Sequence, residues 1–544
     1  MNGETRSFGL TSRTEDAASP VLCNVRADGR LDGLLFSLTL RQTYRNTSTR
    51  TLEVVYTFPL PSQAVLLGFA TELNRVRKVG TMVAHRIAEL RYEQALAEGD
   101  APVMLESLGD GLHTANIGNL KPGDDLVLEV CFAQVLTFDQ GRLRLAIPTT
   151  IAPRYGDAGA AGLQPQQVPL ASMLAEHTLA LSVTIVGTLA DASIDCPTHQ
   201  VVRKAVEDGM RLELALGAWL DRDVVIVVEP KEQLQSLVLQ GVDAIAPSAA
   251  TVVMAAMQPK PSAYRAGIAL KLLVDCSSSM AGDSIGSARA AISGVLARLT
   301  ESDHVSLTCF GDHVRHLLKP TACSRATLRY LQIDVDAIDA NLGGTEMDAA
   351  LKAVFGLRMP KTCESADVLL LTDGEFWRPE EMLAAARASG HRIFAIGVGA
   401  SPAEGALRSL AEATGGACEF ATPGEALEAA AGRMLNRIRQ QPWRDPRIDW
   451  GSEPAWQTRL APHVFGGDTV IAFAGMPAAA TAPTVRLLAM DAQEAEVEIA
   501  QGAAKAAGPG ETVARIAAAQ RIFHPYKFDV KEVPWWSVYE IGQR

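Results

Sequence analysis

The chain has 544 residues, 48% of them hydrophobic and 21% charged, and its formal net charge is −12. This length rules out a single core, because domains usually stop growing near ~250–300 residues, and the composition rules out wholesale disorder. The net negative charge disfavours non-specific binding to nucleic acid, which draws on clustered lysine and arginine. We therefore expect two or three folded units in a protein that does not bind nucleic acid.

The first 20 residues, MNGETRSFGLTSRTEDAASP, are polar and lack the apolar core of a signal peptide. No apolar run elsewhere in the chain approaches the ~20 residues that a membrane-spanning helix needs. We therefore expect a flexible N-terminus over residues 1–20 and a cytoplasmic protein that does not insert into a membrane.

Residues 21–155 show the pattern of a β domain. Short alternating or apolar runs, such as LLFSLTLRQTYRN and DDLVLEVCFAQVL, are separated by Pro, Gly and Asn, which is typical of an antiparallel sandwich or barrel. Residues 82–99 carry apolar side chains at helical spacing and end on a glycine, so we expect one inserted helix. In residues 156–264 strand patterns resume after a Gly- and Pro-rich connection, which predicts a further β-sheet region packed on the first unit.

Strands and helices alternate from residue 265 to residue 440. Continuous apolar runs such as IALKLLVD, DVLLLTD and HRIFAIGVG are separated by amphipathic segments such as SIGSARAAISGVLARL. This alternation predicts a mainly parallel sheet covered on both faces, a doubly wound, Rossmann-like α/β domain. Residues 441–544 return to strand-like runs and end in an aromatic tail with Trp535, Trp536 and Tyr539. The tail either packs on the chain's own β domain, which we favour, or serves as a docking peptide.

Oxygen-bearing side chains follow three of the predicted βα units. The three segments are Asp275-Cys276-Ser277-Ser278-Ser279, Gly343-Gly344-Thr345 and Asp373-Gly374. Because ligands of doubly wound sheets gather at the carboxyl ends of the strands, we expect these segments to meet. Two carboxylates and three hydroxyls, with no His or thiolate among the ligands, suit Mg²⁺ or Mn²⁺ rather than Zn²⁺ or copper. Alone, the first segment is better explained as a polar turn with helix-capping serines, but the three together predict a metal site.

These segments resemble the metal-ion-dependent adhesion site of the von Willebrand factor type A (VWA) domain, and the resemblance covers residues 265–440. It implies that Ser277 and Ser279 bind Mg²⁺ directly and that Thr345 binds it directly or through water. It also implies that Asp275 and Asp373 hold the coordinating waters. Mn²⁺ and Ca²⁺ are alternative ions. Further matches to the family pattern are Met280, Gly282 and Asp303.

Residues 21–155 resemble the VIT domain, which is named for vault proteins and inter-alpha-trypsin inhibitor heavy chains. The resemblance rests on YRN (44–46), YTFPLP (56–61), AELRYEQALAEG (88–99), IGNLKPGD (117–124) and IPTTIAPRY (147–155). In that family the VIT domain stands immediately before a VWA domain, as it does here, and the combination resembles heavy chain-like proteins of bacterial type. Since the Pro, Gly and aromatic residues of this unit equally suit a generic β sandwich, we assign it a scaffold role.

The heavy-chain pattern also shows departures. The secreted heavy chains have a signal peptide and an Asp-Pro-His processing site, whereas here Asp445-Pro446 is followed by Arg447. An extracellular matrix role is therefore not expected.

We predict a non-catalytic protein–protein interaction module in which a partner's Asp or Glu completes the coordination of Mg²⁺. One alternative is a scaffold or assembly subunit in which the metal only stabilises the domain. The other is a metal-dependent phosphohydrolase, which needs a second carboxylate two residues after Asp275, where this chain has Ser277. H-E-x-x-H does not occur, which disfavours zinc hydrolases of that type. Carboxylates close to the three segments predict basic residues beside the partner's acid; they are Asp283, Glu346, Asp348 and Glu375.

Overall fold

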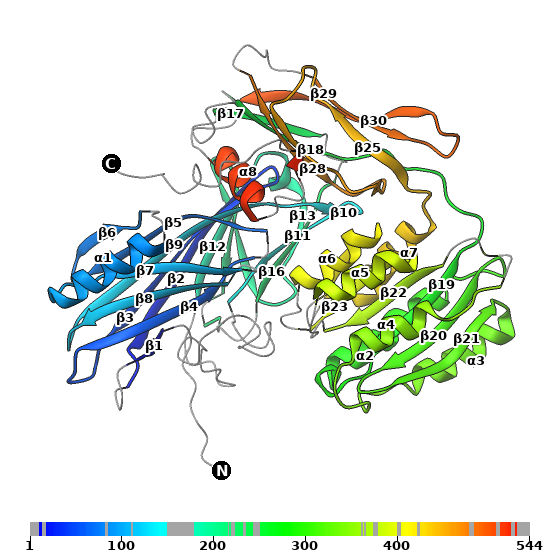
Figure 1. The fold of residues 1–544 in the computed structure, drawn as a ribbon, viewed down its shortest axis with the longest axis horizontal. Coiled ribbons are helices and arrows are strands. Elements are labelled where there is room, and N and C mark those ends of the chain that lie inside the picture. Colours follow the sequence, from blue (N-terminus) through cyan, green and yellow to red (C-terminus); the bar gives the residue numbers. More distant parts are fainter. Residues whose placement is uncertain are drawn as a thin grey trace.

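The computed structural model shows three bodies of secondary structure (Figure 1). It describes residues 10–13, 18–61, 63–81, 85–109, 112–149, 179–215, 217–218, 223–231, 236–242, 251–360, 363, 366–373, 379–399, 404–421, 425–477, 484–506, 512–523 and 528–529. The predicted aromatic tail and the Gly- and Pro-rich connection lie outside the described residues. Every helix within these ranges is too short or too polar to cross a membrane.

The N-terminal body is a β unit with one helix, α1 (His85–Ala97). Its strands are β1 (Leu10–Ser12), β2 (Val21–Asp32), β3 (Leu35–Arg45), β4 (Leu52–Pro59), β5 (Val65–Leu73), β6 (Val76–Val79), β7 (Val103–Gly109), β8 (Leu112–Leu120), β9 (Asp125–Val135), β10 (Phe138–Asp139), β11 (Arg142–Ile147), β12 (Ala180–Val186), β13 (Ser193–Asp195), β14 (Val201–Val206), β15 (Gly209–Leu214) and β16 (Val224–Glu229). An eight-stranded sheet has the order β14-β15-β12-β2-β3-β9-β5-β6, and two four-stranded sheets have the orders β1-β4-β8-β7 and β10-β11-β16-β13.

Strand alternation builds the core of this unit. Side chains of β3 and β9 alternate between buried and partly exposed, as expected for strands with one face on a core. Most pairings are antiparallel, but β12 pairs with β2 in parallel. The prediction of a flexible N-terminus is wrong at Leu10–Ser12, which pairs with β4, because Leu10 is buried in the core at 1% exposure.

The α/β domain contains one six-stranded sheet between two layers of helices. Its elements are β19 (Ala269–Asp275), α2 (Asp283–Leu296), β20 (His304–Phe310), β21 (Val314–Ala322), α3 (Arg325–Asp336), α4 (Met347–Phe355), β22 (Asp367–Thr372), α5 (Pro379–Ser389), β23 (Arg392–Val398), α6 (Glu404–Thr414), β24 (Cys418–Ala421) and α7 (Leu427–Arg439). The strand order is β21-β20-β19-β22-β23-β24, and all neighbours are parallel except the antiparallel pair β20–β21.

Alternate side chains of β19 face opposite helix layers. Leu270 lies in a hydrophobic cluster with residues of α2, α3 and α7, whereas Leu273 lies in a second cluster with residues of α4, α5 and α6. The doubly wound architecture predicted from the sequence is therefore confirmed.

The third body is a nine-stranded sheet with the order β27-β25-β29-β30-β17-β18-β28-β26-β31. Its elements are β17 (Leu237–Val242), β18 (Thr251–Met257), β25 (Trp443–Asp449), β26 (Trp456–Thr458), β27 (His463–Val464), β28 (Val470–Met476), β29 (Thr484–Met490), β30 (Glu496–Ala506), α8 (Thr512–Phe523) and β31 (Phe528–Asp529). The region predicted as one β block, residues 156–264, is thus divided. Strands β12 to β16 join the N-terminal sheets, whereas β17 and β18 pair with strands from the C-terminal region because their hydrogen-bonding edges meet β30 and β28.

Arg437 on α7 ties the three bodies together. Its side chain is 1% exposed and donates hydrogen bonds to Asp468 at 2.7 and 2.8 Å, to Asp139 of β10 at 3.4 Å and to Glu419 of β24. Arg433 also donates to Glu419, at 2.6 Å. A buried charge is tolerated only when it is paired, so this cluster fixes how the bodies meet.

We expect Arg437→Met to lower the free energy of unfolding by about 3–5 kcal/mol, because buried carboxylates lose their cation. Urea denaturation followed by tryptophan fluorescence measures this change. Arg447→Met is the matched control, since Arg447 and its partner Glu496 are 55% and 45% exposed and such pairs contribute about 1 kcal/mol or less. Similar small changes in both variants would contradict the assignment.

Candidate metal-binding site

The parallel pairing of β19 with β22 brings the two predicted aspartates together. The register runs from Leu270↔Asp367 to Val274↔Leu371, so the next residues, Asp275 and Thr372, lie side by side. The Thr372 hydroxyl donates a 2.6 Å hydrogen bond to Oδ2 of Asp275. Asp373 follows Thr372 directly, and both carboxylates therefore stand at the same edge of the sheet.

The segment after Asp275 turns tightly and places two hydroxyls in contact. Oδ1 of Asp275 accepts a 2.9 Å hydrogen bond from the backbone N–H of Ser277, and the hydroxyls of Ser277 and Ser279 lie 2.9 Å apart. Asp275 and Ser277 are buried, whereas Ser279 is exposed. Cys276 and Met280 enter the hydrophobic core on the other side of the turn. Cys276 and Met280 thus face the core, whereas Asp275, Ser277 and Ser279 lie on the side of the sheet edge.

Backbone hydrogen bonds hold the loop that carries Thr345 against this turn. The N–H of Ser278 donates to the carbonyl of Gly343 at 2.8 Å, and the N–H of Leu342 donates to the carbonyl of Cys276 at 2.9 Å. Gly343 has a φ of +75°, a backbone conformation that residues with a Cβ rarely adopt. The Thr345 side chain is partly buried and makes no hydrogen bond within the described part of the chain, so its oxygen is available to a ligand.

The electrostatics of the two aspartates fit a cation. Burial raises the pKa of Asp275 to about 6, the nearby charge of Asp373 adds to the rise, and hydrogen bonds from Thr372 and Ser277 oppose it. Within the described residues Oδ1 of Asp373 is buried without a hydrogen-bond partner, an arrangement that costs free energy unless something binds there. Hydroxyl and carboxylate oxygens are the ligands that Mg²⁺ and similar hard ions prefer, so these residues fit a metal ion.

The other donors of the described chain do not offer a competing site. No group of three or more His, Cys, Asp and Glu side chains within the described ranges is arranged to hold a metal. Gly374 and Glu375, which the sequence places after Asp373, lie outside those ranges. Asp303, a further match to the family pattern, lies away from the candidate site, before β20. It accepts hydrogen bonds from the N–H groups of Ile268 and Thr300 and pairs with Arg439, so it fixes the start of the sheet.

Two residues of this region were not predicted from the sequence. Thr372 was not singled out, although the parallel register of two strands ending in Asp275 and Asp373 indicates it. Lys271 is 1% exposed and donates to the carbonyls of Val354 and Leu357 at 2.9 and 2.8 Å, and burial lowers its pKa to about 8. It anchors the end of α4, the helix that follows Thr345, but nothing in its local sequence separates it from an ordinary strand lysine.

Two domain families match this chain in sequence. The vault protein inter-alpha-trypsin (VIT) domain matches residues 22–132, and the von Willebrand factor type A domain matches residues 268–420. The chain is a VIT- and VWA-domain protein. The predicted resemblance to the VIT and VWA families is therefore confirmed, and the VWA match covers all three segments of the candidate site.

Several curated proteins are similar to this chain in sequence. Human von Willebrand factor A domain-containing protein 5A is 24% identical, over 82% of this chain and 61% of its own length. A von Willebrand factor A domain-containing protein of Dictyostelium discoideum is 24% identical, over 76% of this chain and 44% of its own length. The mouse protein mono-ADP-ribosyltransferase PARP4 is 22% identical, over 85% of this chain but 24% of its own length. The chain spans less than two thirds of the length of each of these relatives.

Similar solved structures are more distant. A von Willebrand factor type A protein from Catenulispora acidiphila is 16% identical and has a TM-score of 0.35. The matched region covers 53% of this chain and 79% of the Catenulispora chain. Proximal thread matrix protein 1 from the mussel byssus, with a zinc-occupied MIDAS motif, is 16% identical, covers 33% of this chain and 48% of its own, and has a TM-score of 0.27. These similarities are too weak to argue from.

We expect Gly343→Ala to destabilise the VWA domain by about 1–2 kcal/mol, because its φ is positive and a Cβ would lie 2.5 Å from Oδ2 of Asp312. The neighbouring Gly344→Ala is the control, since its Cβ would meet nothing within 4 Å and its φ is not positive. The melting temperatures of both variants measure the difference. Equal values for the two variants would show that the loop is not held in this conformation.

Proposed function

We propose that the VWA domain is a non-catalytic protein-binding module whose adhesion site is formed by Asp275, Ser277, Ser279, Thr345 and Asp373. The observation that carries the proposal is the buried, unpartnered oxygen of Asp373 at the sheet edge where Asp275 and the paired serine hydroxyls also lie. Ser277, Ser279 and Thr345 would supply neutral oxygens to Mg²⁺, with Mn²⁺ and Ca²⁺ as alternatives. Asp275 and Asp373 would hold its waters. A bound ion with mostly neutral direct ligands attracts an external carboxylate.

The chain's own residues orient this site. Both carboxylate oxygens of Asp275 accept hydrogen bonds, from Thr372 and from the N–H of Ser277, so Asp275 is held in place. This engagement supports a positioning role and disfavours Asp275 as a nucleophile, which argues against the phosphohydrolase alternative. We therefore propose a partner Asp or Glu, rather than a substrate, as the species that completes the site.

Charges at the rim favour a particular kind of partner. Asp283 and Glu346 are exposed close to the site, and Asp348 is already paired with Lys352. These carboxylates repel an acidic peptide unless it also carries cations. We propose a protein partner with Lys or Arg beside its acidic residue, met in the cytoplasm, with neither nucleic acid nor a membrane as the target.

The scaffold alternative has its own support. Arg437 and its carboxylates hold the VWA domain to the other two bodies, as an assembly subunit requires, whether or not a partner binds at Asp373. In that case the metal would stabilise the domain without recruiting a carboxylate.

Metal binding is tested by isothermal titration calorimetry with MgCl₂. We expect Ser279→Ala and Thr345→Ala to weaken the affinity by about 10-fold or more, in the range measured when supporting residues of metal sites are removed. Ser278→Ala is the control, because Ser278 is exposed and its side chain makes no hydrogen bond within the described residues. Unchanged affinity in the first two variants would refute the ligand assignment.

Partner recruitment is tested by affinity capture from lysate, read by mass spectrometry. Proteins retained by wild type in Mg²⁺ should be lost in EDTA and lost in Thr345→Ala, but kept by Ser278→Ala. Retention that is the same under all conditions would reject the adhesion proposal and favour the scaffold. Synthetic peptides of a recovered partner, with and without the basic residues beside its acid, then test the rim charges, since equal binding of both peptides would contradict that part.

A further inference from the structure

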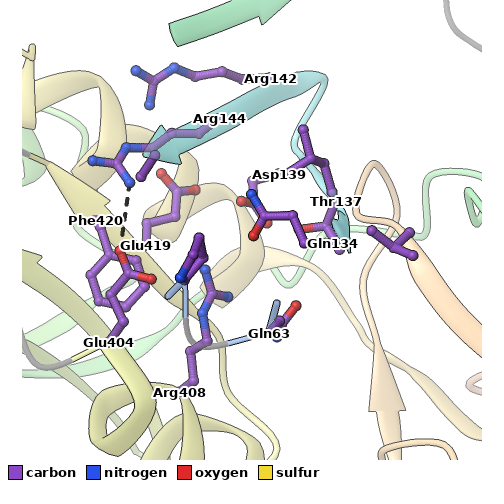
Figure 2. Close-up of a pocket in the computed structure, with 14 residues that line it drawn as sticks. Gln63, Gln134, Thr137, Asp139, Arg142, Arg144, Glu404, Arg408, Glu419 and Phe420 are labelled. Atoms are coloured by element: carbon purple, nitrogen blue, oxygen red, sulfur yellow. Dashed lines mark ion pairs between the residues drawn. The ribbon is translucent and has the colours of Figure 1, made fainter. Parts of the chain in front are cut away.

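A polar pocket lies at the junction of the VIT and VWA domains, apart from the candidate metal site (Figure 2). The VIT side is formed by strands β9 to β11 and by residues 61 and 63, and the VWA side by α6 and β24. The cavity volume is about 60 Å³, which is the space of a few water molecules or of one small ionic group. Pockets at domain junctions are common places for small ligands.

Most arginines around the pocket are paired with buried carboxylates. Arg142 and Arg144 share Glu425, at 2.6 and 3.0 Å, and the Glu425 side chain is 1% exposed. Arg433 and Arg437 share Glu419 deeper in the junction. These four guanidinium groups therefore have their counter-charges in direct contact.

Arg408 on α6 is different. Within the described residues no carboxylate oxygen forms an ion pair with it, its Nε is buried without a hydrogen-bond partner, and its guanidinium lies 5.0 Å from the centre of the Phe420 ring. Burial lowers the pKa of Arg408, but the longer-range charges of acidic groups, Glu404 first among them, together outweigh burial and raise it. Arg408 is thus a fixed cation whose hydrogen-bonding groups are unused.

Neutral polar groups of the VIT domain face this cation. Gln134 is 5% exposed, and its amide has no hydrogen-bond partner within the described chain. Figure 2 shows Arg408 and Gln134 extending into the pocket from opposite domains, with Gln63 and Thr137 on its VIT wall. The side chains of Arg408 and Gln134 therefore both have hydrogen-bonding groups that are available to a molecule in the pocket.

We propose that this pocket is an anion site, in which Arg408 binds the carboxylate or phosphate group of a small ligand and Gln134 and Thr137 donate further hydrogen bonds. A guanidinium favours such groups because it donates two parallel hydrogen bonds to them. The ligand joins the VIT and VWA domains, so it stabilises their junction.

Three acidic residues line the same pocket, and each is engaged by arginines other than Arg408. Glu419 pairs with Arg433 and Arg437. Oε1 of Glu404 lies 3.9 Å from Arg144, and Oδ1 of Asp139 lies 3.4 Å from Arg437. Burial raises the pKa of Asp139 to about 7, the charge of Arg437 opposes the rise, and the charges of Glu419 and Asp468 add to it. The ion pairs with arginine reduce the repulsion that these carboxylates exert on a bound anion.

The test uses the full chain in EDTA, so that no metal at the VWA site binds the added anion. Sodium phosphate and sodium acetate are titrated at constant ionic strength against sodium chloride, and binding is followed by calorimetry and by the melting temperature. We expect a saturable rise in melting temperature with at least one of the two anions, reduced at least threefold in Arg408→Gln. Arg329→Gln, an exposed arginine on α3, is the control and should behave as wild type.

A response to phosphate alone or to acetate alone supports the site and identifies the group that it binds. If circular dichroism shows that Arg408→Gln does not fold, Gln134→Leu and Thr137→Val replace it, since both keep the size of the side chain, and each should weaken binding at least threefold. The proposal is overturned if neither anion binds saturably. It is also overturned if wild type and all folded pocket variants bind the anions equally well. Neither result depends on whether the VWA domain binds metal.

Discussion

The parallel pairing of β19 with its two neighbours is the constraint on which the VWA domain depends. It places the ends of β19 and β22 in register, and so fixes Asp275 against Thr372 and sets Asp373 beside them. The same pairing buries every residue of β19, including Lys271 and Asp275, between two helix layers. Since a parallel strand can be buried on both faces only if helices cover it, the position of the candidate site and the doubly wound core have one physical origin.

Buried polar groups help to select one strand register in this domain. Lys271 has three acceptors, the carbonyls of Val354 and Leu357 and a ring nitrogen of His391, and Asp367 pairs with Arg265 and Arg392. Lys271 and Asp367 both make their hydrogen bonds inside the protein, and a shifted register would break these bonds. Oδ1 of Asp373 differs from these groups, because it is buried without a hydrogen-bond partner within the described residues, and it is therefore the strongest structural sign of a ligand.

The sequence predicted the elements well where local pattern decides them. The α/β alternation, the inserted helix and the three segments of the candidate site follow from periodicity, glycine positions and short polar runs. Periodicity also predicted an apolar face on α1, but Ile87 and Leu90 are 46% and 61% exposed, because a helical pattern does not say what covers it. Long-range pairing was likewise beyond local pattern. Strands β17 and β18 join strands more than two hundred residues later, and Arg437 has partners from β10, β24 and residue 468.

The distribution of apolar contacts explains why charged residues gather at the junction with the VWA domain. The VIT core is continuous with side chains of β18, β28 and α8, so the VIT domain and the C-terminal sheet share one hydrophobic cluster. The VWA domain has its own two clusters, in which Phe465 is the contribution from the C-terminal body. Apolar packing therefore holds the first and third bodies together, whereas the orientation of the VWA domain depends on Arg142, Arg144 and Arg437 and their carboxylates. Ion pairs are directional, so they fix the direction in which Asp373 and the serine hydroxyls face. The polar pocket lies at the same junction, where Arg408 has no carboxylate partner within the described chain.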